Sequence, residues 1–182
     1  MKRLIYKRLL EWKNDPNRKP LILNGARQVG KTWILKEFGA KEYANVAYIN
    51  CDEIEEMKTI FFDFHTERLI RSFSVLSGEV IKPNETLIVL DEIQTVSLGL
   101  TSLKYFCEKA PQYHIVVAGS LLGIGLHEST GFPVGKVKEM NLYPLSFKEF
   151  LMALDQDILI HAMEDHRWME LSSFKSKFIE LL

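Results

Sequence analysis

Two kinds of hydrophobic pattern alternate along this chain. Short apolar runs are typical of strands that are covered on both faces of a parallel sheet. They predict strands over residues 21–24, 46–50, 86–90, 114–118 and 137–142. Elsewhere apolar residues recur every three or four positions, which is typical of amphipathic helices. This second pattern predicts helices over residues 2–12, 31–38, 53–77 and 98–109. Strands and helices in alternation predict an α/β fold with an open, mostly parallel sheet.

The pattern becomes purely helical after residue 146. Ser146 and Glu149 have the spacing of a capping box, which marks the start of a helix. We therefore expect an N-terminal helix over residues 1–15, an α/β core over 16–150 and a helical region over 151–182. The apolar pattern of the last residues meets no glycine, proline or cap. We expect the natural protein to continue into a further C-terminal domain.

Composition and charge narrow the class of protein. The chain is 47% hydrophobic and 26% charged, which is ordinary for a globular domain. Its formal net charge of −1 gives no overall attraction to nucleic acid or to an acidic membrane surface. A nucleic-acid or protein partner is not indicated by the sequence, although net charge does not exclude a local basic patch. No run approaches the roughly 20 apolar residues of a membrane span, and no signal peptide precedes the core. Cys51 and Cys107 are far apart, which favours reduced thiols in a cytoplasmic protein.

The stretch GARQVGKT, residues 25–32, follows the first predicted strand and matches a P-loop, G-x-x-x-x-G-K-[ST], at every fixed position. Gly25 and Gly30 allow the main chain to approach phosphates closely, with loop N–H groups and a helix N-terminus facing the anion. Lys31 is expected to reach the β- and γ-phosphates, and the Thr32 hydroxyl to bind Mg²⁺. The nucleotide-binding residues expected are Gly25, Ala26, Arg27, Gln28, Val29, Gly30, Lys31, Thr32 and Trp33.

The third predicted strand ends in two carboxylates, Asp91 and Glu92, in the stretch LIVLDE. We expect Asp91 to hold the Mg²⁺ ion, directly or through its water shell, and Glu92 to polarise an attacking water. For its carboxyl end to reach the ion, this strand is expected to lie beside the first one. A water-activating neighbour favours hydrolysis over transfer of the phosphoryl group to a substrate. Ser120, after the strand over 114–118, is a further candidate near the γ-phosphate.

These motifs together resemble the AAA-type ATPases of bacteria and archaea that are often fused to a C-terminal domain of unknown function. The stretches that carry the resemblance are GARQVGKT, LIVLDEIQ, HIVVAGSLLG and FPVGKVKEMNLYPLSFKEFL. The resemblance implies a P-loop NTPase fold, a three-layer αβα sandwich with five strands in the order 5-1-4-3-2. It also implies a longer natural protein, and places Gln94 near the nucleotide.

Lys136 departs from this resemblance, because many relatives carry an arginine at the matching position. That arginine is a candidate finger for the γ-phosphate, of the same or a neighbouring subunit. Lys136 is a candidate catalytic residue at that position, but lysine supplies charge without a planar bidentate fork, which leaves slow hydrolysis open as an alternative. The sequence does not decide whether copies assemble into a homo-oligomer.

The leading hypothesis is an ATPase that binds Mg-ATP and uses hydrolysis to move an attached domain or a partner. Absence of an N-K-x-D base-reading motif favours ATP over GTP. One alternative is an interaction module that binds ATP and changes conformation with negligible turnover. Another is a small-molecule kinase on the same fold, which is weakened because no arginine-rich lid or acceptor-binding segment is recognisable.

Overall fold

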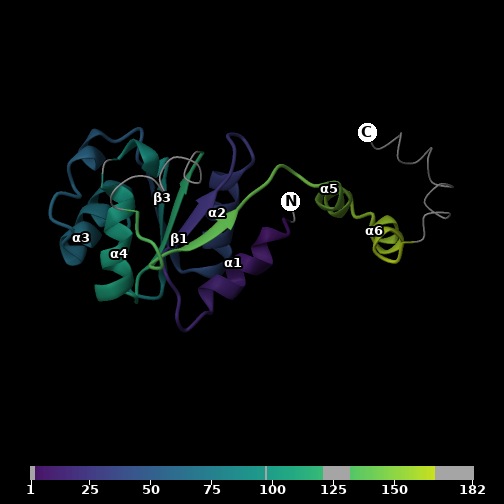
Figure 1. Ribbon diagram of the computed structural model, residues 1–182, viewed down its shortest axis with the longest axis horizontal. Helices are drawn as coiled ribbons and strands as arrows, with labels where there is room; N and C mark the ends of the chain where they lie inside the picture. The colour runs from purple at the N-terminus through teal and green to yellow at the C-terminus, as the bar shows by residue number, and fades with distance from the viewer. Residues whose placement is uncertain (1–2, 97, 121–131, 167–182) are drawn as a thin grey trace. The chain divides into compact units, whose positions relative to one another are not determined.

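The computed structural model describes residues 3–96, 98–120 and 132–166 (Figure 1). The chain divides into two compact units. The larger unit is Ile5–Pro144, and the smaller unit combines the first four residues with Leu145 and the residues that follow it. Among the described segments, every helix falls short of the length and apolar character that a membrane crossing requires.

The larger unit is built on a five-stranded sheet in which every pair of neighbouring strands is parallel. The strands are β1 (Leu21–Asn24), β2 (Asn45–Asn50), β3 (Thr86–Asp91), β4 (His114–Gly119) and β5 (Lys138–Asn141). Their spatial order is β2-β3-β4-β1-β5. This order is 5-1-4-3-2 read from the other edge, so the predicted fold and strand order are confirmed. Because all strands run in one direction, their carboxyl ends meet along one edge of the sheet.

Helices cover both faces of this sheet, as Figure 1 shows. Successive strand residues point to opposite faces. Leu87 and Val89 therefore join one hydrophobic core with helices α1 (Ile5–Lys13) and α2 (Lys31–Glu42). Ile88 and Leu90 join the other with α3 (Thr66–Ser77) and α4 (Gly99–Lys109). The two cores on either side of the sheet are the reason for the three-layer architecture.

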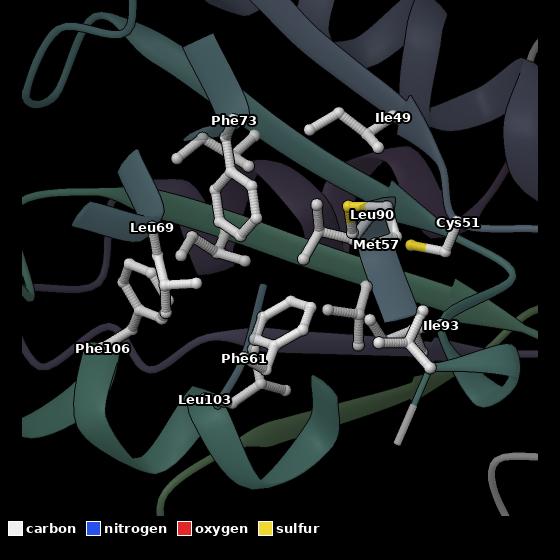
Figure 2. Packing of buried hydrophobic residues seen from close by; sticks show 14 of the residues in the cluster. Ile49, Cys51, Met57, Phe61, Leu69, Phe73, Leu90, Ile93, Leu103 and Phe106 are labelled. Carbon is white, nitrogen blue, oxygen red and sulfur yellow. The ribbon is translucent and has the colours of Figure 1, made fainter. Parts of the chain in front are cut away.

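The predicted long helix over residues 53–77 was wrong. The segment contains a 3₁₀ turn, η1 (Glu55–Lys58), and then α3, with a loop between them. Phe64 has a left-handed backbone (φ 52°) that ends helical continuity, and the Asp63 carboxylate accepts hydrogen bonds from the His65 N–H and from Arg68. Met57 and Phe61 are nevertheless buried in the same core as α3 (Figure 2). Their spacing therefore reflects burial rather than one continuous helix.

The expectation that β3 lies directly beside β1 was also wrong, because β4 lies between them. The carboxyl end of β3 is still reached from the loop after β1. Helix α2 follows that loop and packs across β2 and β3. The first turn of α2 thereby carries its side chains over the edge of the sheet to β3.

The smaller unit contains α5 (Phe147–Ala153) and α6 (Asp157–Glu164), which enclose Leu151, Leu159 and Ile160. The predicted capping box is confirmed. The Ser146 hydroxyl accepts from the Glu149 N–H at 3.2 Å, and the Glu149 carboxylate accepts from the Ser146 N–H at 2.9 Å. The apolar pattern of residues 171–182 lies outside the described residues.

Candidate functional site

The loop between β1 and α2 needs glycine at both of its fixed positions. A Cβ atom on Gly25 would lie 2.5 Å from the Leu142 carbonyl oxygen, a backbone atom that cannot move aside easily. Gly30 has a left-handed backbone (φ 92°, ψ 27°), which glycine adopts without steric cost. These two positions let the loop turn tightly from the end of the strand into the helix.

Lys31, the first residue of α2, is folded back into this loop. Its side chain is buried, with the residue only 6% exposed. Nζ donates hydrogen bonds to the carbonyl oxygens of Gly25 at 2.9 Å and Ala26 at 2.8 Å. These partners are neutral, so the positive charge of the ammonium is available to an anion held by the loop.

Asp91 ends β3 and is 3% exposed. Its Oδ2 atom accepts hydrogen bonds from the Thr32 hydroxyl at 2.5 Å and from the Tyr48 hydroxyl at 3.1 Å. Its Oδ1 atom accepts from the Glu92 N–H at 3.1 Å. Burial, followed by the charge of Asp91, raises the pKa of Tyr48 well above its usual range, so the phenol stays protonated. The structure thus joins the loop's hydroxyl residue to the carboxylate that was expected to share an ion with it.

Glu92 turns the chain sharply away from the sheet. Its backbone is left-handed (φ 53°), and its carbonyl oxygen accepts from the N–H and hydroxyl of Thr95 in the 3₁₀ turn η2 (Ile93–Thr95). The Gln94 side-chain amide donates from Nε2 to the Glu92 carboxylate. The Gln94 Oε1 atom is buried without a hydrogen-bond partner. The orientation of the Glu92 carboxylate is therefore held by its own turn.

Lys31, Thr32 and Glu92 line one pocket of about 670 Å³ at the carboxyl edge of the sheet, whereas Gly25 and Asp91 are not among its lining residues. The residues that line it are Arg27, Gln28, Gly30, Lys31, Thr32, Trp33, Asn50, Asp52, Glu92, Gln94 and Thr95. The sequence did not identify Asn50, Asp52 and Thr95 as residues of the pocket. It also did not identify the contact of Tyr48 with Asp91. Asn50 and Asp52 could have been anticipated, because both are polar and lie at or just after the end of β2, which the expected order places next to β3.

Ser120 and Lys136 are not among the residues that line this pocket. Ser120 follows β4 at the carboxyl edge, where Gly119 pairs with Asn24. Lys136 precedes β5, whose first residue pairs with Leu21 at the start of β1. It therefore lies at the amino edge, on the far side of the sheet from the loop. There its ammonium pairs with Glu108 of α4 at 3.0 Å, and the hydrogen bond lowers the pKa of Glu108.

The side chains at the carboxyl edge fit a nucleotide phosphate and a Mg²⁺ ion. Thr32 and Asp91 present oxygen atoms, the ligand type that Mg²⁺ prefers, within hydrogen-bond distance of each other. Gly25 and Gly30 allow the tight turn of the loop, and Lys31 supplies positive charge there. Nothing in the donor set favours a softer metal, which would select sulfur or imidazole ligands.

Comparisons with known proteins give the family of this chain. The model of the AAA domain family matches residues 17–151. An uncharacterized protein of Haemophilus influenzae is 27% identical over 138 residues, which are 75% of this chain and 34% of that protein. The chain thus spans about a third of the length of that curated relative.

Two solved structures share the fold. The Walker-type ATPase PABY2304 of Pyrococcus abyssi superposes with a TM-score of 0.53 at 19% identity, over 85% of this chain and 57% of that one. AMPPCP-bound DnaA of Aquifex aeolicus gives a TM-score of 0.51 at 16% identity, over 86% of this chain and 50% of that one. At these identities the likeness is one of fold. The family model covers most of the larger unit, including the loop, β3 and the pocket between them, and the chain belongs to the AAA domain family.

Proposed function

We propose that this chain is the core of a Mg²⁺-dependent ATPase, which binds ATP at the loop over residues 25–32 and hydrolyses it with Glu92. The observation that carries the proposal is the convergence on one pocket of the buried Lys31, the Thr32–Asp91 contact and the Glu92 carboxylate. Family membership supports nucleotide binding in general. The DnaA neighbour, which holds AMPPCP, supports an adenine nucleotide on this fold.

The roles of the residues follow from their chemistry. Loop N–H groups and the Lys31 ammonium bind the phosphates and offset their negative charge. Thr32 and Asp91 hold the Mg²⁺ ion, which supplies positive charge against the charge that develops on the transferred phosphoryl group. Glu92 accepts the proton of the attacking water as a general base. Gln94 donates to Glu92 and keeps the carboxylate in one orientation.

The test is the Glu92→Gln variant, which keeps the side-chain shape but removes the base. We expect phosphate release to fall by about 100-fold or more, while affinity for Mg-ATP changes little because Glu92 is not a phosphate ligand in this proposal. Glu11→Gln is a matched control, since Glu11 lines a separate cavity at the other edge of the sheet. Unchanged turnover in Glu92→Gln would remove Glu92 from its role.

A second candidate is an ATP-gated interaction module with negligible turnover. Two observations favour it: Lys136 lies away from the pocket, and the Glu92 carboxylate is already engaged by Gln94. Tight ATP binding without phosphate release over hours would support this function against the first.

In either form we propose that nucleotide state is passed to a following domain or to a partner. The Leu142 N–H donates to the Asn24 carbonyl oxygen at 2.7 Å, directly before Gly25 of the loop. The nucleotide loop is thereby bonded to the segment that leaves the sheet. Protease protection of residues 143–150 with and without Mg-ATP measures this coupling, and identical protection would argue against it.

A further inference from the structure

The Asp91 carboxylate has a partner that the motif pattern does not contain. Tyr48 lies on β2, where it pairs with Val89 of β3, and Asn50 pairs with Asp91. Paired residues of adjacent strands point to the same face of a sheet, and so do residues two positions apart. Tyr48, Val89 and Asp91 therefore all point to the face covered by α2. The phenol extends towards the carboxyl edge, and its hydroxyl donates to Asp91 Oδ2 at 3.1 Å.

Helix α2 also contacts the Tyr48 ring, through Lys36. The Lys36 ammonium lies 3.8 Å from the centroid of the ring, within the range of a cation–π contact. Lys36 is four residues after Thr32, so both side chains lie on the same face of α2. Thr32 and Lys36 thus contact the carboxylate and the ring, respectively, from consecutive turns of one helix.

We propose that Tyr48 is a positioning residue for the magnesium site. Its hydroxyl fixes the Asp91 carboxylate towards Thr32 before the ion arrives, so that less ordering accompanies binding. Partners that orient a metal-ligating carboxylate commonly change metal affinity by about 10- to 100-fold. The inference rests on the proposed function, because it assumes that Asp91 serves Mg²⁺ bound with a nucleotide.

A packing role for Tyr48 makes a different prediction. The ring lies against the core that α1 and α2 share with the sheet, and any aromatic residue would fill that space. Only the hydroxyl reaches Asp91. Tyr48→Phe therefore separates the two roles, because it keeps the ring and removes the hydrogen bond.

The experiment titrates Mg²⁺ against the full chain with a fluorescent ATP analogue and measures the half-saturating Mg²⁺ concentration for nucleotide binding. We expect Tyr48→Phe to raise this concentration about tenfold, with nucleotide affinity in EDTA unchanged. Tyr6→Phe is the matched control. The Tyr6 hydroxyl also donates to a carboxylate, that of Glu42 at 2.7 Å, but outside the pocket.

A double-mutant cycle shows whether Tyr48→Phe acts through its contact with Asp91 or through a general loss of folding. In an Asp91→Asn background, Tyr48→Phe should shift the Mg²⁺ requirement by less than about twofold, because the two residues act through one contact. Equal half-saturation in wild type and Tyr48→Phe would overturn the inference, as would an equal loss of affinity in EDTA or an equal shift in Tyr6→Phe. If the wild type binds the nucleotide without any dependence on Mg²⁺, the magnesium role in the proposed function fails and this inference fails with it.

Discussion

The two edges of the sheet both carry charged residues and a cavity, yet they differ in how the charges are placed. At the amino edge a cavity of about 400 Å³ is lined by Arg8, Glu11 and Lys19, all exposed side chains, among others. Cations there bond to the protein surface, as Lys19 does to the Gly135 carbonyl oxygen at 2.7 Å. At the carboxyl edge Lys31 and Asp91 are both buried.

Within the larger unit, the two edges therefore differ in the burial of their charged residues rather than in the number of those residues. Removing a charged group from water is costly unless partners compensate. The burial of Lys31 and Asp91 is compensated by hydrogen bonds. Lys31 donates to a loop carbonyl oxygen, and Asp91 accepts from a hydroxyl and from an N–H group. Ligands of open α/β sheets bind outside the carboxyl ends of the strands, and Lys31 and Asp91, which are buried in the larger unit, lie at that edge.

The largest difference between the two edges is expected when one lysine is removed from each of them. We expect Lys31→Ala to weaken binding of Mg-ATP by about 100-fold, because a buried cation facing a polyanion is lost. Lys136→Ala should change that affinity by less than about twofold, because its exposed pair with Glu108 lies at the amino edge. Isothermal titration calorimetry measures both. An equal loss in Lys136→Ala would mean that this ammonium reaches a phosphate, for example in a neighbouring subunit.

The amino edge contains a buried histidine, His114, which is expected to affect stability rather than nucleotide binding. His114 opens β4 there, 4% exposed, with Nδ1 placed 2.7 Å from the Tyr43 hydroxyl. Burial, followed by the charges of Arg18 and Lys13, lowers the pKa of His114 to about 4. Below about pH 6.5, the ordinary pKa of histidine, the unfolded chain binds the proton more tightly than the folded one. Stability is therefore lost as pH falls from 6.5 towards 4.

The expected loss is about 2 kcal/mol in the free energy of unfolding between pH 6.5 and pH 4.5. Urea denaturation at several pH values measures it. Carboxylates titrate in the same range, so the quantity that matters is the difference between the wild type and His114→Phe. A pH dependence that is identical in the two proteins would show that His114 titrates normally.

The smallest expected effect concerns one glutamine from each edge. Gln94→Ala removes the donor to the Glu92 carboxylate, and a hydrogen bond to a charged group is worth about 1.5–3 kcal/mol. We expect turnover to fall about tenfold, with Mg-ATP affinity nearly unchanged. Gln112, an exposed residue just before β4, supplies the control Gln112→Ala. Faster turnover in Gln94→Ala would instead show that the contact restrains Glu92.

Three of the five strands, β1, β3 and β4, were predictable because their burial is uniform. Residues of β1, β3 and β4 are buried throughout, so apolar runs locate them closely. The segment over 53–77 was not predictable from its pattern. Phe61 fills the core from a loop, and a core requires apolar volume at a place in space rather than a helix in the chain.

The candidate site was predictable where sequence motifs identify its residues, and less so where the pairing of neighbouring strands decides which residues meet. The placement of Thr32 beside Asp91 followed from two motifs. Tyr48 depends on the register of β2 against β3, which no local pattern contains. The position of Lys136 could have been deduced, because a residue that precedes a parallel strand lies at the opposite edge from the residues that follow one.

The close approach of Gly25 to Leu142 has a mechanical consequence. Because even a methyl group would not fit at that contact, the loop over residues 25–32 packs closely against Leu142, which directly follows β5. A ligand that moves this loop is therefore expected to move the chain just after β5 with it.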